Sequence, residues 1–152
     1  MDEAAKCELL CSTCHALEEA TRAVAAYRAL PERPGDTARP CSRHGLQPHH
    51  LSEGRWRCRT CRSERVIAWY RRRKAYLVEC LGGRCERCKA PVPVVAFQFH
   101  HRDRATKAFS LSGPGLFRSL PIVLEELAKC ELVCANCHAE LEATLSSRAG
   151  GG

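Results

Sequence analysis

The chain has 152 residues and a formal net charge of +7, and 12 of its residues are cysteines. No apolar stretch approaches the roughly 18 residues that a membrane span needs, and no basic start followed by an apolar run marks a signal peptide. We therefore expect a cytoplasmic protein with no membrane partner. In that compartment, closely spaced cysteines bind metal more often than they form disulfides. Because only 6% of the residues are aromatic, we expect bound zinc to supply part of the folding free energy.

The N-terminal part, residues 1–30, contains the first copy of an internal repeat. Residues 6–21 match residues 129–144 at 11 of 16 positions, with a constant offset of 123. The first copy lacks the sequence that precedes the second, so we interpret it as a degenerate zinc-knuckle repeat without catalysis. Its Cys11 and Cys14 need two further ligands to hold a metal. They could compete for the ligands of another site, bind a partner chain or remain free.

A helix is predicted over residues 16–30, which are rich in Ala and Glu, and Pro31 ends it. Residues 31–40 are a linker by composition. The short module over residues 41–61 follows, and it resembles a zinc ribbon in the spacing of its ligands. The pairs of this module predict a second structural zinc, held by Cys41, His44, Cys58 and Cys61.

Two further features of this module are open to a functional interpretation. Trp56 could stack on a base, but a buried tryptophan is the preferred interpretation. His49 and His50 have no knuckle in the right order after them, and we interpret them as loop residues.

A basic segment follows over residues 62–83. A helix is predicted over residues 62–81, stopped by Gly82 and Gly83. Residues 39–107 carry 17 Lys and Arg against 5 Asp and Glu, a net charge of +12, whereas the rest of the chain is net negative. Each phosphate contacted releases condensed counterions, so nucleic acid is the expected partner, with an acidic protein as the weaker alternative. The candidate phosphate-binding residues are Arg62, Arg65, Arg71, Arg72, Arg73 and Lys74.

The last domain is predicted over residues 84–146, before a flexible tail at residues 147–152. We expect a strand within residues 92–99 after Pro93, a helix within residues 116–129 with Pro121 in its first turn, and a final helix over residues 137–145. Two Cys-x-x-Cys pairs flank these elements and predict a four-sulfur structural zinc site. Its ligands are Cys85, Cys88, Cys134 and Cys137.

A second, open metal site is predicted in the same domain. His138 and Glu142 are four residues apart on the final helix, so both side chains project from one face. His100 could supply a third ligand from the end of the predicted strand, and His101 lies next to it. An open position is what a hydrolytic metal requires.

These motifs resemble an HNH endonuclease of the zinc-knuckle subgroup over residues 74–144. The resemblance is carried by the Cys-x-x-Cys pairs, by Phe99-His100-His101-x-Asp103, by Lys107-x-Phe109 and by the knuckle from Lys129 to Glu140. It implies a ββα-metal fold in which His100, His138 and Glu142 hold a divalent ion and His101 is the general base for water. Glu142 stands where many members of the family have histidine, and a carboxylate favours Mg²⁺ or Mn²⁺. Asn136, the only asparagine, could anchor the base loop or cap the helix.

We therefore predict an α+β protein: a small zinc-stabilised ββα-metal (HNH) domain preceded by a basic helix and a short zinc-ribbon-like module. The expected function is that of a metal-dependent DNA endonuclease, a hydrolase that cleaves phosphodiester bonds. The alternative is a catalytically inactive zinc-dependent nucleic-acid-binding protein. A redox-sensing thiol protein is disfavoured because most cysteines pair into knuckles, which leaves Cys7, Cys80 and Cys130 as buried or free thiols.

Overall fold

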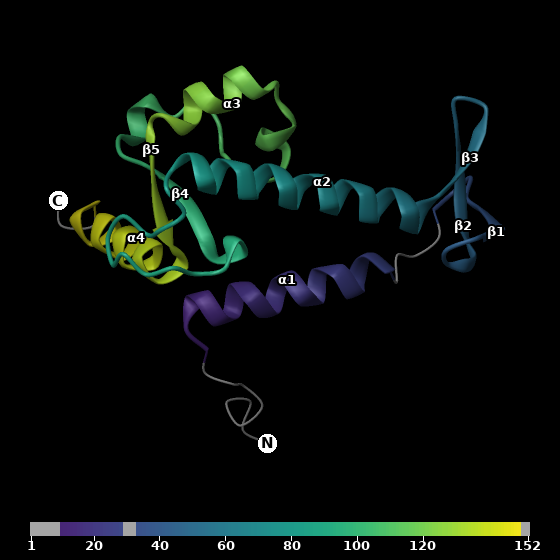
Figure 1. Cartoon of the computed structure of the whole chain (residues 1–152), viewed down its shortest axis with the longest axis horizontal. Helices are drawn as coiled ribbons and strands as arrows, with labels where there is room; N and C mark the ends of the chain where they lie inside the picture. The colour runs from purple at the N-terminus through teal and green to yellow at the C-terminus, as the bar shows by residue number, and fades with distance from the viewer. Residues whose placement is uncertain (1–9, 29–32, 150–152) are drawn as a thin grey trace. The chain divides into compact units, whose positions relative to one another are not determined.

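The computed structural model describes residues 10–28 and 33–149. Across these residues the protein is α+β, with four α-helices and two small antiparallel sheets (Figure 1). The chain divides into two compact units, one formed by residues 20–73 and the other by residues 1–19 with 74–152. None of the described helices is both long and apolar enough to cross a membrane.

The unit of residues 20–73 contains a three-stranded meander. Strands β1 (Thr37–Cys41), β2 (Gly45–Ser52) and β3 (Arg55–Cys58) pair in that order. Between β2 and β3 the chain turns through Glu53 and Gly54, at φ values of 52° and 71°, a two-residue geometry that suits the twist of a hairpin. β3 leads directly into helix α2 (Arg59–Cys80).

Two predictions for this unit were wrong. The linker predicted to Pro40 already contains β1 from Thr37, and His49 and His50 lie in β2 instead of a loop. Both segments carry a proline and no regular alternation of apolar residues, so neither shows the sequence pattern of a strand. All of β1 pairs with the first part of β2, and the rest of β2 pairs with β3, so hydrogen bonds across the sheet order both segments although their local patterns do not indicate strands.

The two long helices confirm the sequence pattern, with shifted ends. Helix α1 (Ser12–Arg28) begins before the predicted residue 16, and the predicted stop at Pro31 lies outside the described residues. Helix α2 spans Arg59–Cys80 against the predicted 62–81. Gly82 and Gly83 follow it at φ values of 83° and 66°, and the Gly83 N–H donates to the Val78 carbonyl at 3.0 Å. This left-handed geometry favours glycine and closes the helix as predicted.

The second unit is built on the two-stranded sheet of β4 (Phe97–His101) and β5 (Cys130–Cys134). The register places Phe97 opposite Cys134 and His101 opposite Cys130. Helix α3 (Leu120–Leu127), with Pro121 in its first turn as predicted, precedes β5, and α4 (Ala135–Ala149) follows it. Figure 1 shows β4 and β5 side by side, with α4 against them.

The predicted strand of residues 92–99 is shifted toward its C-terminal end. Val94–Ala96 form a short 3-10 helix behind Pro93, and the strand proper runs over Phe97–His101. Pairing with β5 covers five residues and includes both histidines. The strand pairing therefore fixes the directions in which the side chains of His100 and His101 project.

The core of this unit contains the cysteine cluster. Phe97, Leu132 and Val133 are 1% exposed or less and pack with Val78. Cys85, Cys134 and Cys137 belong to the same buried cluster. The positions of these thiols are therefore fixed by apolar packing as well as by their own loops.

Candidate metal centres and active site

Four cysteine sulfurs come together where β5 ends and α4 begins. The ligand atoms of Cys85, Cys88, Cys134 and Cys137 all lie within 4.8 Å of one another, with the Cys88 and Cys134 sulfurs 3.8 Å apart. The Cys137 N–H donates to the Cys134 sulfur at 3.5 Å, as expected for a knuckle that presents its sulfurs to one ion. These four thiols could hold a zinc ion, as their spacing predicts.

The thiols of this group differ in how readily they ionise. Burial opposes ionisation of Cys85, but backbone N–H groups around its sulfur, including those of Cys88 and Arg87, lower its pKa to about 6. Burial, reinforced by the neighbouring thiols, raises the pKa of Cys137. Zinc binding to the group must therefore release protons, and the release makes the affinity depend on pH.

The second group lies in the other unit, where Cys41, His44, Cys58 and Cys61 also have ligand atoms within 4.8 Å of one another. The Nδ1 of His44 is 3.6 Å from the Cys41 sulfur and 3.4 Å from the Cys61 sulfur. The Arg43 N–H and the His44 contacts lower the pKa of Cys41 to about 6, whereas burial and the adjacent thiols raise that of Cys61 to about 11. This group could hold a second zinc ion, as predicted.

The outer nitrogen of His44 has a partner that the sequence analysis missed. His44 Nε2 lies 3.1 Å from Glu64 Oε1, and Arg43 donates to the other carboxylate oxygen of Glu64 at 3.0 Å. A carboxylate on the far side of a histidine ligand fixes the ring and its tautomer. Glu64 lies within α2, where nothing in the local sequence distinguishes it from a solvated glutamate.

A third group brings together the residues predicted to form the open metal site. The ligand atoms of His100, His138 and Glu142 lie within 4.8 Å of one another. Glu142 Oε1 is 3.8 Å from His100 Nδ1 and 3.8 Å from His138 Nε2, and the two rings meet edge to face at 5.4 Å. Burial, with a contribution from His138, lowers the pKa of His100 and favours the neutral form that binds metals. Two imidazoles and a carboxylate could hold a divalent ion.

The Glu142 carboxylate also has the guanidinium group of an arginine beside it. Arg104 donates to Glu142 Oε2, and this hydrogen bond is the main reason that the pKa of Glu142 is lowered. Arg104 belongs to the short 3-10 helix Arg104–Thr106, whose first turn Asp103 caps by accepting from the Ala105 N–H at 2.9 Å. Arg104 was not among the site residues predicted from the sequence.

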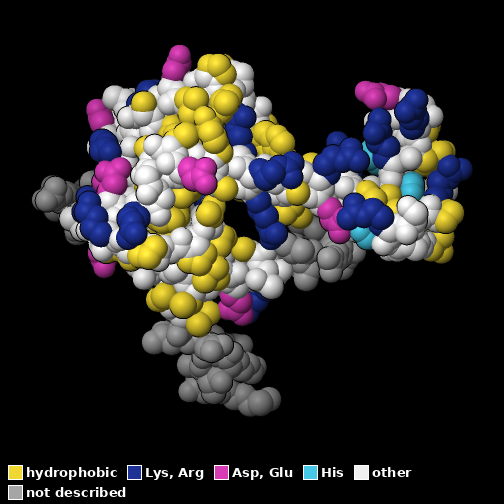
Figure 2. Space-filling view, viewed as in Figure 1, with side chains coloured by type: hydrophobic (Ala, Val, Ile, Leu, Met, Phe, Trp, Pro, Cys, Tyr) yellow, Lys and Arg dark blue, Asp and Glu magenta, His cyan; other side chains and the backbone are white. Residues whose placement is uncertain are grey.

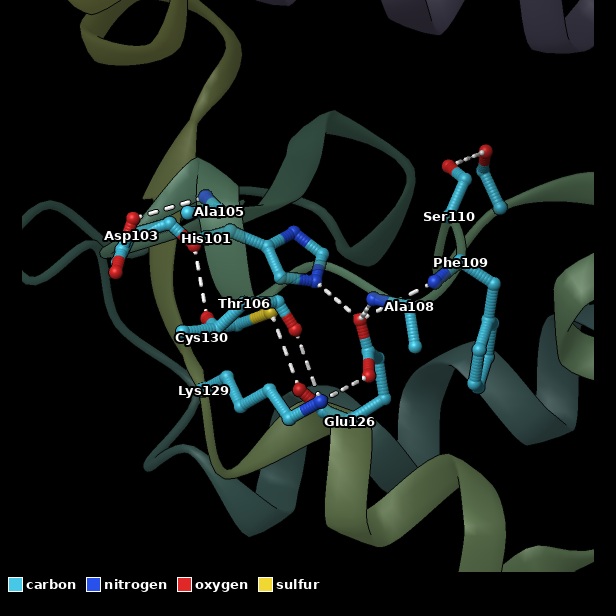
Figure 3. Close-up of polar contacts among 11 residues, drawn as sticks. His101, Asp103, Ala105, Thr106, Ala108, Phe109, Ser110, Glu126, Lys129 and Cys130 are labelled. Carbon is cyan, nitrogen blue, oxygen red and sulfur yellow. Dashed lines mark hydrogen bonds and ion pairs between the residues drawn. The ribbon is translucent and has the colours of Figure 1, made fainter.

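His101, the predicted general base, is 6% exposed and is held by a buried carboxylate (Figure 3). Its Nε2 lies 2.8 Å from Glu126 Oε1, and the same oxygen accepts from the Ala108 N–H at 2.8 Å and the Phe109 N–H at 3.3 Å. Lys129 donates to the other oxygen at 2.7 Å. In Figure 3 the second ring nitrogen of His101 points away from Glu126.

The hydrogen bonds to Glu126 define the proton positions on His101. Burial raises the pKa of Glu126, but donors including Lys129 and His101 outweigh it and lower that pKa to about 2. An ionised carboxylate only accepts hydrogen bonds, so Nε2 of His101 carries a proton and, in the neutral ring, Nδ1 has the lone pair. Glu126 was not predicted as a site residue, because it stands in the run Leu124-Glu125-Glu126-Leu127, where nothing distinguishes it from its neighbour.

The six predicted phosphate-binding residues do not share one environment. Arg62, Arg65, Arg71 and Arg72 are exposed, whereas Arg73 stacks on Trp69 and Lys74 is half-buried. The Lys74 ammonium donates to the Val95 carbonyl at 3.0 Å, and burial lowers its pKa to about 8. In the unit of residues 20–73, Arg62 and Arg65 line a surface hollow with Arg57, and arginine side chains gather over its sheet and along its part of α2 (Figure 2).

Trp56 is 37% exposed, so the prediction of a buried tryptophan was wrong. Its cross-strand neighbour Leu51 is 56% exposed. The guanidinium of Arg39 lies 4.5 Å from the centre of the Trp56 ring, a cation–π contact on the sheet surface. A half-exposed ring beside a cation is compatible with stacking on a base.

The N-terminal repeat forms a knuckle but not a closed site. Cys11 and Cys14 are exposed, and they belong to none of the potential ligand groups found among the described residues. The side-chain oxygen of Asn136 accepts from the Thr13 N–H at 3.2 Å, a contact that the sequence did not predict. Among the remaining cysteines, Cys130 is buried, Cys80 is exposed, and Cys7 lies outside the described residues.

The chain matches no protein-family model, no curated protein and no solved structure.

Proposed function

We propose that the protein is a metal-dependent DNA endonuclease of the HNH type, with β4, β5 and α4 as its ββα-metal element. One observation carries the proposal. A group of two histidines and a glutamate that could hold a divalent ion includes His100, which directly precedes His101 in β4, and the Nε2 of His101 is held by a buried, ionised carboxylate. A purely structural site has no need for a second, oriented histidine next to its ligands.

His101 is the general base in this proposal. Glu126 keeps the proton on Nε2, so Nδ1 accepts a proton from the water that attacks the phosphorus. Glu126 then stabilises the imidazolium that forms, because it stays ionised. It is a positioning residue, since it touches His101 and not the substrate.

His100, His138 and Glu142 would hold the divalent ion, Mg²⁺ or Mn²⁺ being favoured by the carboxylate. A bound ion supplies Lewis-acid stabilisation of the phosphate and of the leaving oxygen. Arg104, which pairs with Glu142, is a second positive charge at the edge of the same group. It suits a site that receives an anionic substrate.

The exposed arginines of α2 and of the meander bind the phosphate backbone in this proposal. Arg62 and Arg65 contribute with Arg57 to one basic hollow, and Arg71 and Arg72 extend the positive charge along α2. Lys74 is not included among the contacts, because its ammonium is engaged by the Val95 carbonyl. Binding through phosphates predicts an affinity that falls steeply with salt.

The test is cleavage of supercoiled plasmid by the zinc-loaded protein with added Mg²⁺, Mn²⁺ or Ni²⁺. We expect the parent to cut and His101→Ala to lose cutting while it still folds and binds DNA. The repeat provides a matched control: His138→Ala removes a proposed ligand, whereas His15→Ala removes the equivalent histidine of the first copy. We expect cutting to be lost in His138→Ala and kept in His15→Ala.

The alternative is a zinc-dependent nucleic-acid-binding protein without cleavage. Its specific support is the half-exposed Trp56 beside Arg39 and the exposed arginines of α2, which serve binding alone equally well. Salt-sensitive binding by parent and variants with no cutting under any ion would establish it. Equal cutting by the parent and His101→Ala would contradict the proposed base.

A further inference from the structure

The N-terminal Cys11-x-x-Cys14 segment has the conformation of a zinc knuckle. The two sulfurs are 3.4 Å apart, close to the roughly 3.8 Å expected for two sulfurs bound at ~2.3 Å to one tetrahedral zinc. The Cys14 N–H donates to the Cys11 sulfur at 3.4 Å, as the Cys137 N–H does to the Cys134 sulfur at 3.5 Å. The first copy of the repeat therefore presents its thiols as the second copy does.

This knuckle is held in place by the second copy. The side-chain oxygen of Asn136 accepts from the Thr13 N–H at 3.2 Å. Asn136 and Thr13 are equivalent positions of the repeat, 123 residues apart. Both belong to the unit of residues 1–19 and 74–152, so the contact lies within one compact body.

The knuckle offers two ligands, and zinc requires four. Within the part of the chain that the structure describes, neither Cys11 nor Cys14 belongs to a group of three or more potential ligands. His15 is directed to Glu19, with 4.0 Å between its Nε2 and the carboxylate oxygen. Both thiols are exposed, so the two open coordination positions face solvent.

We propose that Cys11 and Cys14 are half of an intermolecular zinc site, completed by the same two cysteines of a second copy of this chain. Two identical Cys-x-x-Cys knuckles supply the four thiolates of a structural zinc site. A two-fold axis through the ion makes the arrangement self-complementary, as in an isologous dimer. Among the described residues the site is incomplete in one chain, and a second chain would complete it.

The parity of the zinc count tests this proposal. Every other zinc site occurs twice in a symmetric dimer, so a shared ion makes the total odd. We expect native mass spectrometry of the full chain, zinc-loaded and kept reduced, to show a dimer with an odd number of zinc ions. The double variant Cys11→Ser with Cys14→Ser should be a monomer, and two such monomers together should hold one zinc ion fewer than the parent dimer.

Cys80→Ser is the matched control, because Cys80 is exposed and belongs to none of the potential ligand groups found among the described residues. It should remain a dimer with the parent's zinc count. Circular dichroism, and zinc retained at the Cys41 and Cys85 groups, would show that the double variant is folded. A parent monomer, a dimer with an even zinc count, or a dimer that survives in the double variant would each overturn the proposal. None of these results depends on cleavage, so they leave the proposed nuclease activity untouched.

Discussion

The network around Glu126 makes the strongest quantitative prediction, through the substitution Glu126→Gln. Glutamine has nearly the same shape but no charge, and it carries donors where the carboxylate only accepts. The carboxylate accepts from His101, Lys129 and the backbone N–H groups of Ala108 and Phe109, and the residue is 2% exposed. The substitution therefore leaves a donor facing donors in a buried position.

The magnitude follows from the pKa. Lowering the pKa of Glu126 from 4.5 to about 2 corresponds to about 3 kcal/mol at 1.36 kcal/mol per unit. Because the glutamine oxygen can still accept from one backbone N–H, we expect a loss of about 2 kcal/mol in the free energy of unfolding at pH 7. The folded-state pKa is depressed, so this contribution is present above pH 4.5 and lost as the pH falls toward 2.

The assay must report on the unit that contains Glu126. Both tryptophans, Trp56 and Trp69, lie in the other unit, so tryptophan fluorescence would miss the change. Amide hydrogen exchange at Ala108 and Phe109 reports it directly, and urea unfolding followed by circular dichroism at fixed free zinc gives the free energy. Glu125→Gln is the control, because Glu125 is the exposed neighbour.

Parent and Glu126→Gln should converge as the pH falls from 4.5 toward 2, since the parent then protonates the same carboxylate. Zinc also leaves as the thiolates protonate, but this affects both proteins alike. A surface substitution ordinarily changes the free energy of unfolding by roughly 0.5 kcal/mol or less. If the free energies of unfolding of Glu126→Gln and of the Glu125→Gln control differ by no more than this at pH 7, the stabilising role of the ionised Glu126 carboxylate is refuted.

Three further predictions concern residues outside the ligand groups. Glu64→Gln should weaken zinc binding at the Cys41 group about 10- to 100-fold, as measured by chelator competition. The control Glu79→Gln changes an exposed residue of the same helix and should leave the zinc affinity unchanged. Equal zinc affinities of the two variants would exclude a role for the His44–Glu64 contact. Arg104→Ala should raise the pKa of Glu142 in an NMR titration of the metal-free protein. The control Arg102→Ala, which loses an ion pair with Glu86, should leave the pKa of Glu142 unchanged. An unchanged pKa of Glu142 in Arg104→Ala would show that Arg104 does not cause its lowering. Gly115→Ala should cost about 1 to 3 kcal/mol, because its Cβ would lie 1.8 Å from the Ser110 carbonyl oxygen; a loss no larger than that of the exposed Ser119→Ala control would contradict the clash.

The features that the sequence predicted are those defined by short-range spacing. A Cys-x-x-Cys pair forms its own turn, so each predicted zinc group needed only two such turns to meet. His138 and Glu142 share a helical face for the same local reason. Helix α2 and its stop at Gly82 and Gly83 also follow from neighbouring residues.

The features that were not predicted depend on contacts between residues that are distant in the chain. Glu126 and His101 are 25 residues apart, and His44 and Glu64 are 20 apart. In the sequence each glutamate resembles any solvated helix residue, and only the fold gives it a histidine. Lys74 shows the converse: its position in a basic block indicated a phosphate contact, but packing directs its ammonium to the Val95 carbonyl.

Comparing the two copies of the repeat distinguishes the geometry that the repeated segment itself determines from the contacts that the rest of the fold provides. Both copies place a backbone N–H on the first sulfur of the knuckle and start a helix there. Within residues 10–28 and 33–149, the second copy has β4 and the Cys85 pair against it and closes a four-sulfur group, whereas the first copy closes none. The repeated segment thus determines a pair of ligands and their geometry, while the surrounding chain determines whether that pair is completed from within. An exposed pair that keeps its geometry without an internal complement is therefore a group suited to a partner.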